Sequence, residues 1–236
     1  MNTLLKSICE KGDLNQAALL SRFFKTGHGQ YGEGDKFLGV KVPVIRGVVK
    51  DLWKNCSFDN LEECLASEWH EVRLAALLVL IQQFQHAKMQ PEVQRHCIDF
   101  YLAHLEAVNN WDLVDLSCYE LLGSWLLDKD AALLYNLARD GKTIWEQRIG
   151  IVSTMQFIRH NRLDDTYAIS DILLLHPHDL IQKAVGWLLR EAGKRDEPRL
   201  YSFLASRYHS MPRTMLRYSI EKFPPGKRQA FLKGIV

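Results

Sequence analysis

Residues 70–82, His70-Glu71-Val72-Arg73-Leu74-Ala75-Ala76-Leu77-Leu78-Val79-Leu80-Ile81-Gln82, repeat apolar side chains at three- and four-residue spacing. Leu74, Leu77, Leu78 and Ile81 recur at the period of an α-helix, with polar Arg73 and Gln82 interleaved. Almost every other segment of the 236-residue chain shows the same period. The sequence therefore predicts an all-α protein.

Short breaks with turn chemistry separate the predicted helices. One segment differs, because residues 26–36 contain four glycines and no helical period, and we expect a glycine-rich loop there. Pro43 then suits the first turn of the following helix. The other breaks fall at residues 57–60, 89–91, 127–130, 139–142, 176–179 and 223–226.

An internal repeat appears when four helix starts are aligned. Taking Arg73, Val114, Arg148 and Lys183 as equivalent gives intervals of 41, 34 and 35 residues. Each unit begins a helix with a polar first turn and continues with small residues, where neighbouring helices pack closely. This period is typical of a HEAT-like helical-repeat solenoid, in which the second helices of successive pairs line a concave face. We predict one such domain over residues 1–236.

Composition narrows the function classes. The chain is 47% hydrophobic and 25% charged, and no apolar run approaches the ~20 residues needed to cross a bilayer, so we expect a cytoplasmic protein without a membrane partner. Residues 1–141 carry 14 Lys and Arg against 19 Asp and Glu, a net −5, whereas residues 142–236 carry 16 against 9, a net +7. A basic second half can meet a polyanion. Five cysteines without C-x-x-C spacing, and histidines without H-E-x-x-H, lead us to predict no metal and no cofactor.

Ionisable and aromatic residues share helix faces at the repeated positions. Trp111 and Asp115 are four residues apart, and Asp112 could flank Asp115. A stripe on a later helix combines Lys183, Trp187 and Arg190. Taken alone, a tryptophan is more often part of a core, and an aspartate more often a helix cap or a solvated charge. Their recurrence at equivalent places in a repeat favours a shared site.

The same stretches resemble the AlkD family of DNA alkylation repair glycosylases. The matching segments are residues 37–43, 110–115, 144–148 and 181–191, and the resemblance spans about residues 20–222. It implies a HEAT-like fold that grips duplex DNA and hydrolyses the glycosidic bond of cationic N3- and N7-alkylated purines. By this likeness Asp115 is catalytic, with Trp111, Trp187 and Arg148 beside it. Asn110 stands where other members have an aromatic residue.

Physical chemistry gives its own reason for this residue set. A cationic purine leaves without protonation, so the barrier lies in the positive charge that develops on the sugar. The Asp115 carboxylate would stabilise that charge, and Arg148 nearby would keep it ionised. Tryptophan faces attract cations by roughly 0.5–2 kcal/mol each, so Trp111 and Trp187 would favour a methylated base.

We expect a monomer whose partner is duplex DNA containing alkylated purines, with no obligate protein partner. The predicted phosphate contacts come from the basic second half. Two alternatives stay open at this point: a non-catalytic HEAT-type DNA-binding or scaffold protein, which would have no use for Asp115 in its cleft, and a protein-binding solenoid with an apolar or acidic groove. The residues predicted to bind DNA are Lys183, Arg190, Arg213 and Arg217.

Overall fold

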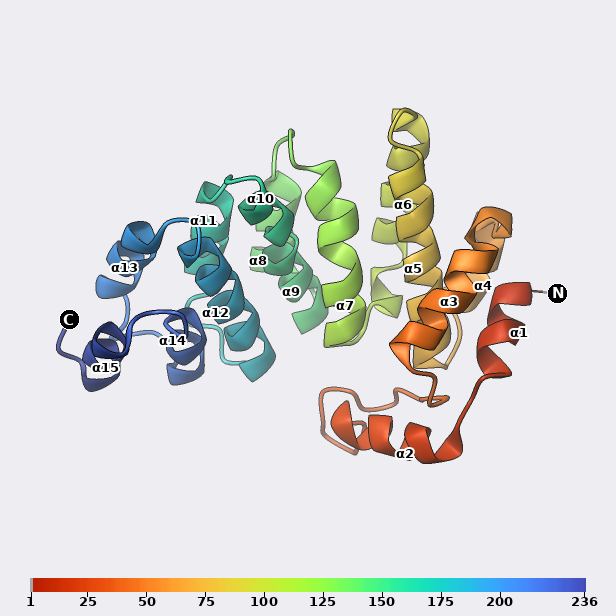
Figure 1. Ribbon diagram of the computed structural model, residues 1–236, viewed down its shortest axis with the longest axis horizontal. Helices are drawn as coiled ribbons and strands as arrows, with labels where there is room; N and C mark the ends of the chain where they lie inside the picture. Colours follow the sequence, from red (N-terminus) through yellow and green to blue (C-terminus); the bar gives the residue numbers. More distant parts are fainter. Residues whose placement is uncertain (1) are drawn as a thin grey trace. The chain divides into compact units, whose positions relative to one another are not determined.

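A computed structural model describes residues 2–236, and all of its regular secondary-structure elements in that range are helices (Figure 1). An isolated bridge between Lys36 and Trp69 is the one β feature among these residues. The all-α prediction is confirmed. The helices are α1 (Thr3–Cys9), α2 (Leu14–Phe23), α3 (Val42–Leu52), η1 (Trp53–Asn55), α4 (Phe58–Leu65), α5 (His70–His86), α6 (Pro91–Ala103), η2 (Leu105–Ala107), α7 (Trp111–Cys118), η3 (Tyr119–Gly123, a π-helical turn), α8 (Ala132–Asp140), α9 (Ile144–Val152), α10 (Met155–Arg159), α11 (Asp164–Ile172), α12 (Asp179–Gly193), α13 (Glu197–Ala205), α14 (Arg213–Ser219) and α15 (Pro225–Lys233).

The breaks expected from turn chemistry lie between these helices. Ser57 caps α4, since its side chain accepts the Asn60 N–H while the Asn60 side chain accepts the Ser57 N–H. Pro43 lies in the first turn of α3, as predicted, where a missing N–H costs no intrahelical bond. No helix described in residues 2–236 is long and apolar enough to span a membrane.

The repeat positions keep the same place in their helices. Arg73, Val114, Arg148 and Lys183 lie in the first two turns of α5, α7, α9 and α12 respectively. The small residues that follow mark close helix packing, which supports the helical-repeat fold. At Gly186, for example, an added Cβ would come within 2.6 Å of the Met215 carbonyl oxygen on α14, so only glycine allows this approach.

The chain divides into two compact units, one ending at Ser117 and the other running from Cys118 to Val236. In the first unit α5 is central, because it packs against α1, α3, α4 and α6 and buries side chains all around its axis. In the second unit α12 has that place, with α9, α13 and α14 against it. The prediction of one domain over residues 1–236 stays a prediction.

Within the first unit α2 lies across the ends of the other helices (Figure 1). It has no buried residue of its own, and Leu14, Leu19 and Phe23 are exposed. The following segment, residues 26–36, is the expected glycine-rich loop of turns, with Gly29 and Gly34 at positive φ. This loop ends at Asp35, whose side chain is buried.

Candidate functional site in the first unit and its counterparts in the second

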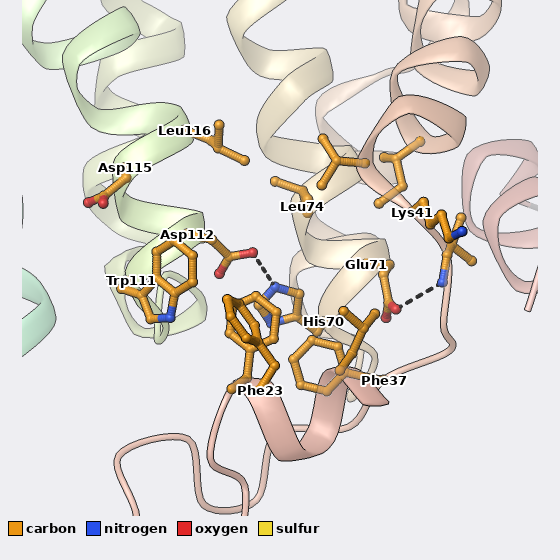
Figure 2. A pocket seen from close by; sticks show the side chains of 15 residues that line it. Phe23, Phe37, Lys41, His70, Glu71, Leu74, Trp111, Asp112, Asp115 and Leu116 are labelled. Atoms are coloured by element: carbon orange, nitrogen blue, oxygen red, sulfur yellow. Dashed lines mark hydrogen bonds and ion pairs between the residues drawn. The ribbon is translucent and has the colours of Figure 1, made fainter. Parts of the chain in front are cut away.

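Helix α7 presents two of the predicted site residues. Trp111 and Asp115 are both half-buried and line the same cavity, and Figure 2 shows them one turn apart on one side of α7. The helix begins at Trp111, whose N–H is accepted by the Asn110 side chain at 2.9 Å. The prediction that these two side chains share a helix face is therefore confirmed.

An aromatic cluster supports Trp111 from the side of α2. Its indole stacks on Phe24, with ring centroids 5.2 Å apart, and meets the edge of Phe23 at 5.9 Å. Phe24 in turn stacks on Phe37, which stacks on the His70 ring at 4.4 Å. Trp111 is thus partly a packing residue, and the rest of its surface lines the cavity.

The cavity has a volume of about 370 Å³ and is bordered almost entirely by carbon atoms. Its lining comes from the aromatic cluster, from the start of α3 and from α5 and α7, all within the first unit. Asp115 is one of three acidic residues that line it, with Glu71 and Asp112, and Figure 2 shows its carboxylate turned away from Asp112 and His70. The arrangement puts an acid and an indole beside an apolar recess, which suits a flat organic group that carries positive charge.

Beneath this surface lies a buried polar network centred on His70, whose side chain is 2% exposed. Its Nδ1 donates to Asp35 at 2.7 Å and its Nε2 to Asp112 at 2.8 Å. Asp35 also accepts from Arg73 at 2.5 Å and from Asn110 at 3.0 Å. The network therefore joins the end of the glycine-rich loop, α5 and the start of α7.

The charged groups in this network shift one another's pKa values toward the ionised forms. Burial disfavours the charged imidazole, but hydrogen bonds and charge from Asp112 and Asp35 outweigh burial and raise the pKa of His70 to about 9. Burial likewise disfavours the Asp35 carboxylate, but His70, Arg73 and Asn110 together lower the pKa of Asp35 below its usual 3.8. At neutral pH His70 is an imidazolium, which matches its two donated bonds.

A third buried carboxylate, that of Glu71, organises the segment that leads into α3. Its two oxygens accept the N–H groups of Leu38, Gly39 and Val40 at 2.8–3.1 Å. Gly39 has a φ of +88°, and a Cβ there would lie 2.1 Å from the Asp13 carbonyl oxygen. This clamp shapes the wall of the cavity formed by Val40, since it fixes the backbone on both sides of Gly39.

The second unit contains the other two residues predicted at the catalytic site. Arg148 is 5% exposed and donates to the Leu180 carbonyl at 2.5 Å, which ties α9 to the start of α12. Trp187 is half-buried on α12 and borders a hollow of about 520 Å³ with Arg159, Lys194 and Arg195. The hollow also contains Glu191, which forms an ion pair with Lys194 at 2.6 Å, so its lining has three basic side chains and one acidic one.

The four residues predicted to bind phosphate also lie in the second unit, in different surroundings. Lys183 forms an ion pair with Asp179 at 2.6 Å, and Arg190 forms ion pairs with Glu191 and Glu221. Arg213 and Arg217 are exposed on α14, and Arg213 donates to the Leu232 carbonyl at 3.1 Å. Their role in binding DNA stays a prediction.

Comparison with known proteins decides the family. The sequence matches the DNA alkylation repair enzyme family over residues 4–223, nearly the whole chain. The protein belongs to this family. Its fold also matches a solved structure described as a predicted DNA alkylation repair enzyme from Enterococcus faecalis, with a TM-score of 0.72 and 18% sequence identity, over 91% of this chain and 98% of that one. No curated protein sequence matches the chain.

For this DNA alkylation repair family member, the site contains residues that sequence reasoning missed. Asp112, expected to flank Asp115, instead turns to His70. The sequence places Asp35 only in a loop, and His70 and Arg73 only in the first turn of a repeat. Spacing offered no signal for their contacts, because the paired residues are 35, 38 and 42 positions apart. Asn110 is buried and donates to Asp35, so the polar side chain at this position has a partner inside the protein.

Proposed function

We propose that this member of the DNA alkylation repair enzyme family is a DNA glycosylase. It excises cationic N3- and N7-alkylated purines from duplex DNA, acting as a metal-free monomer in the cytoplasm. The observation that carries the proposal is the pairing of Asp115 with Trp111 on one side of α7, at the border of an apolar cavity. A site that only gripped the phosphate backbone would gain nothing from a carboxylate there, because like charges repel.

The chemistry needs little from the protein. An alkylated purine that already carries positive charge leaves without a general acid, and the developing charge on the deoxyribose is what must be stabilised. In the proposed reaction the Asp115 carboxylate lies beside that sugar and orients the attacking water. The Trp111 indole offers its face to the cationic base. By the resemblance to the glycosylases, Arg148 is the arginine of the site, and Trp187 is the second tryptophan that faces the damaged nucleotide.

A base-release assay tests this function directly. The purified protein is incubated with dimethyl sulfate-treated duplex DNA, and the free bases are separated by chromatography. We expect N3-methyladenine and N7-methylguanine in the soluble fraction. A protein that binds the duplex but releases no base would be the non-catalytic DNA-binding protein that the sequence left open.

Asp115→Asn tests the mechanism. The substitution keeps the shape of the side chain and removes its charge, so excision should fall about 100- to 1,000-fold, as when one preorganised electrostatic contact worth roughly 3 kcal/mol is lost. DNA binding should persist or tighten. Asp128→Asn makes the same chemical change at an exposed position and serves as the control. Excision by Asp115→Asn at the rate of Asp128→Asn would contradict the role of the carboxylate.

A further inference from the structure

The His70 network touches none of the atoms that the proposed reaction uses, yet it ends at the helix that carries them. His70 donates on both ring nitrogens to carboxylates that belong to two different segments, Asp35 at the end of the loop and Asp112 on α7. Figure 2 shows Asp112 pointing toward His70, away from the side of α7 that presents Asp115.

The two ends of the bridge differ in how firmly they are held. Asp35 keeps Arg73 and Asn110 as partners whether or not His70 is present. Asp112 otherwise accepts only the N–H of its own neighbour, Leu113, at 2.9 Å. Among residues 2–236, His70 is the polar partner of Asp112 outside α7. Removing His70 would therefore leave the Asp35 cluster assembled and release the first turn of α7.

That first turn carries the proposed chemistry. Asp112 lies between Trp111 and Asp115 in the sequence, so a rotation of the turn about the helix axis moves all three side chains together. The Trp111 N–H is capped by Asn110, whose amide is itself bound to Asp35. With the bond that Arg73 donates to the Asn109 side chain at 3.2 Å, three polar links join the start of α7 to the loop and α5. His70 makes the one that acts on the helical turn itself.

We propose that His70 is a positioning residue, which through Asp112 sets the rotation of the first turn of α7 and so directs Asp115 and Trp111 into the site. The proposal rests on the proposed glycosylase function for its kinetic consequences, and on the hydrogen-bond geometry alone for its structural ones. It differs from a purely structural role for His70, in which the bridge would stabilise the fold but leave the direction of Asp115 unchanged.

Two substitutions of similar size separate the two ends of the bridge. His70→Gln places an amide N–H near the position of Nε2 and keeps the bond to Asp112, whereas His70→Asn reaches only the position of Nδ1 and keeps the bond to Asp35. Both remove the ring and the charge, so both lose similar stability. We expect His70→Gln to excise alkylated purines at a rate within about 3-fold of wild type. For His70→Asn we expect a fall of about 10- to 100-fold, typical of a catalytic group misplaced by about 1 Å.

Affinity and coupling give further readouts that a structural role would not move. Both variants should bind methylated duplex with the wild-type Kd, so that the loss for His70→Asn lies in the single-turnover rate. Asp112→Ala should reduce the single-turnover rate as much as His70→Asn does. The double variant that combines these two substitutions should be no slower than either single variant, because both remove the same link between His70 and Asp112. Equal rates for His70→Gln and His70→Asn, or losses that multiply in the double variant, would overturn the proposal.

The pH profile adds an independent check. The charged and titratable groups that face His70 are Asp35 from the loop, Asp112 from α7 and Arg73 from α5, with the Phe24 and Phe37 rings on its faces. The wild-type excision rate should decline as pH rises past about 9, where His70 loses its proton. The His70→Gln profile should stay flat there, since an amide does not titrate. A decline of the same size in both would overturn the proposal.

Hydrogen exchange separates this inference from the proposed function. Amide exchange across residues 111–115 should be faster in His70→Asn than in His70→Gln, whatever reaction the protein catalyses. If the wild type releases no base but this difference in exchange appears, the glycosylase proposal fails and the positioning role stands. If the wild type releases bases but the two variants exchange and react alike, only the positioning role fails. Should His70→Asn not fold, Asp112→Ala breaks the same link from α7 and takes its place in both comparisons.

Discussion

The pH dependence of stability is the sharpest physical consequence of the buried imidazolium. In the folded protein His70 keeps its proton up to a pKa of about 9, whereas in the unfolded chain it titrates near 6.5. The folded state therefore binds more protons than the unfolded state between these values. The stabilisation is complete below pH 6.5 and is lost progressively as pH rises from 6.5 to 9. The variant His70→Gln has no such proton to lose.

The size of the effect follows from the pKa difference. About 2.5 units, at 1.36 kcal/mol per unit, correspond to about 3 kcal/mol of unfolding free energy. For a chain of this length that is about 6–12 °C in Tm. Full burial of the ring means that solvent does not screen the interaction, so the conversion needs no discount for exposure.

Urea or thermal unfolding at several pH values measures this contribution of protonated His70 to the unfolding free energy. The free-energy difference between wild type and His70→Gln should shrink from pH 6.5 to 8.5 by most of the 3 kcal/mol. Titrations that wild type and His70→Gln share cancel in this difference; they include those of His176 and His178, whose pKa burial lowers, and of Cys9 and Cys56, whose pKa burial raises. A difference that stays constant across the window would refute the argument, because His70 would then carry the same charge in both states.

The remaining predictions concern selectivity, DNA binding and packing. Release should be measurable for cationic N3- and N7-alkylated purines, bulky N7 adducts included, and undetectable for uracil or hypoxanthine in the same chromatographic assay, because the proposed site offers no acid to protonate a neutral base; rapid uracil release would show otherwise. Each neutralised phosphate contact should weaken binding to any duplex and reduce the slope of log K against log salt by about one unit, measured by fluorescence anisotropy, whereas solvated helix charges would leave the slope unchanged. In Gly186→Ala the new Cβ would lie 2.5 Å from the Tyr218 Cβ, so overpacking should cost about 1–3 kcal/mol of unfolding free energy, offset by the ~1 kcal/mol that alanine gains in helix propensity. The control Gly47→Ala has open space around it inside α3 and should stabilise the protein by up to ~1 kcal/mol. Equal shifts in Tm for the two variants would contradict the packing argument. The phosphate contacts to be neutralised singly are Lys183, Arg190, Arg213 and Arg217.

Much of the fold was predictable because helix formation leaves a local signal. Apolar spacing over residues 70–82 and the turn chemistry at Ser57 and Pro43 each depend on neighbours within four positions along the chain. The repeat alignment worked for the same reason, since Arg148 and Lys183 recur at one place in their helices. The small residue at Gly186 could be expected from the repeat, whereas its contact with α14 required the structure.

In the candidate site, too, the features set by local spacing were predictable and the long-range contacts were not. Sequence alone placed Trp111 and Asp115 on one helix face, because a four-residue spacing fixes that relation whatever else the chain does. Sequence could not show that Trp111 stacks on Phe24, or that Asp112 turns to His70 and leaves Asp115 to line the cavity.

Only the tertiary structure decided the partners of the buried charges. Asp35 meets His70 across 35 residues and Arg73 across 38, and nothing in the composition of the glycine-rich loop indicates that its last carboxylate ends in the core. A buried charge is tolerated only where partners from other segments surround it, so its position depends on the packing of several elements at once. Helical period is a property of a few consecutive residues, whereas the charge balance around His70 arises only when the loop, α5 and α7 have come together.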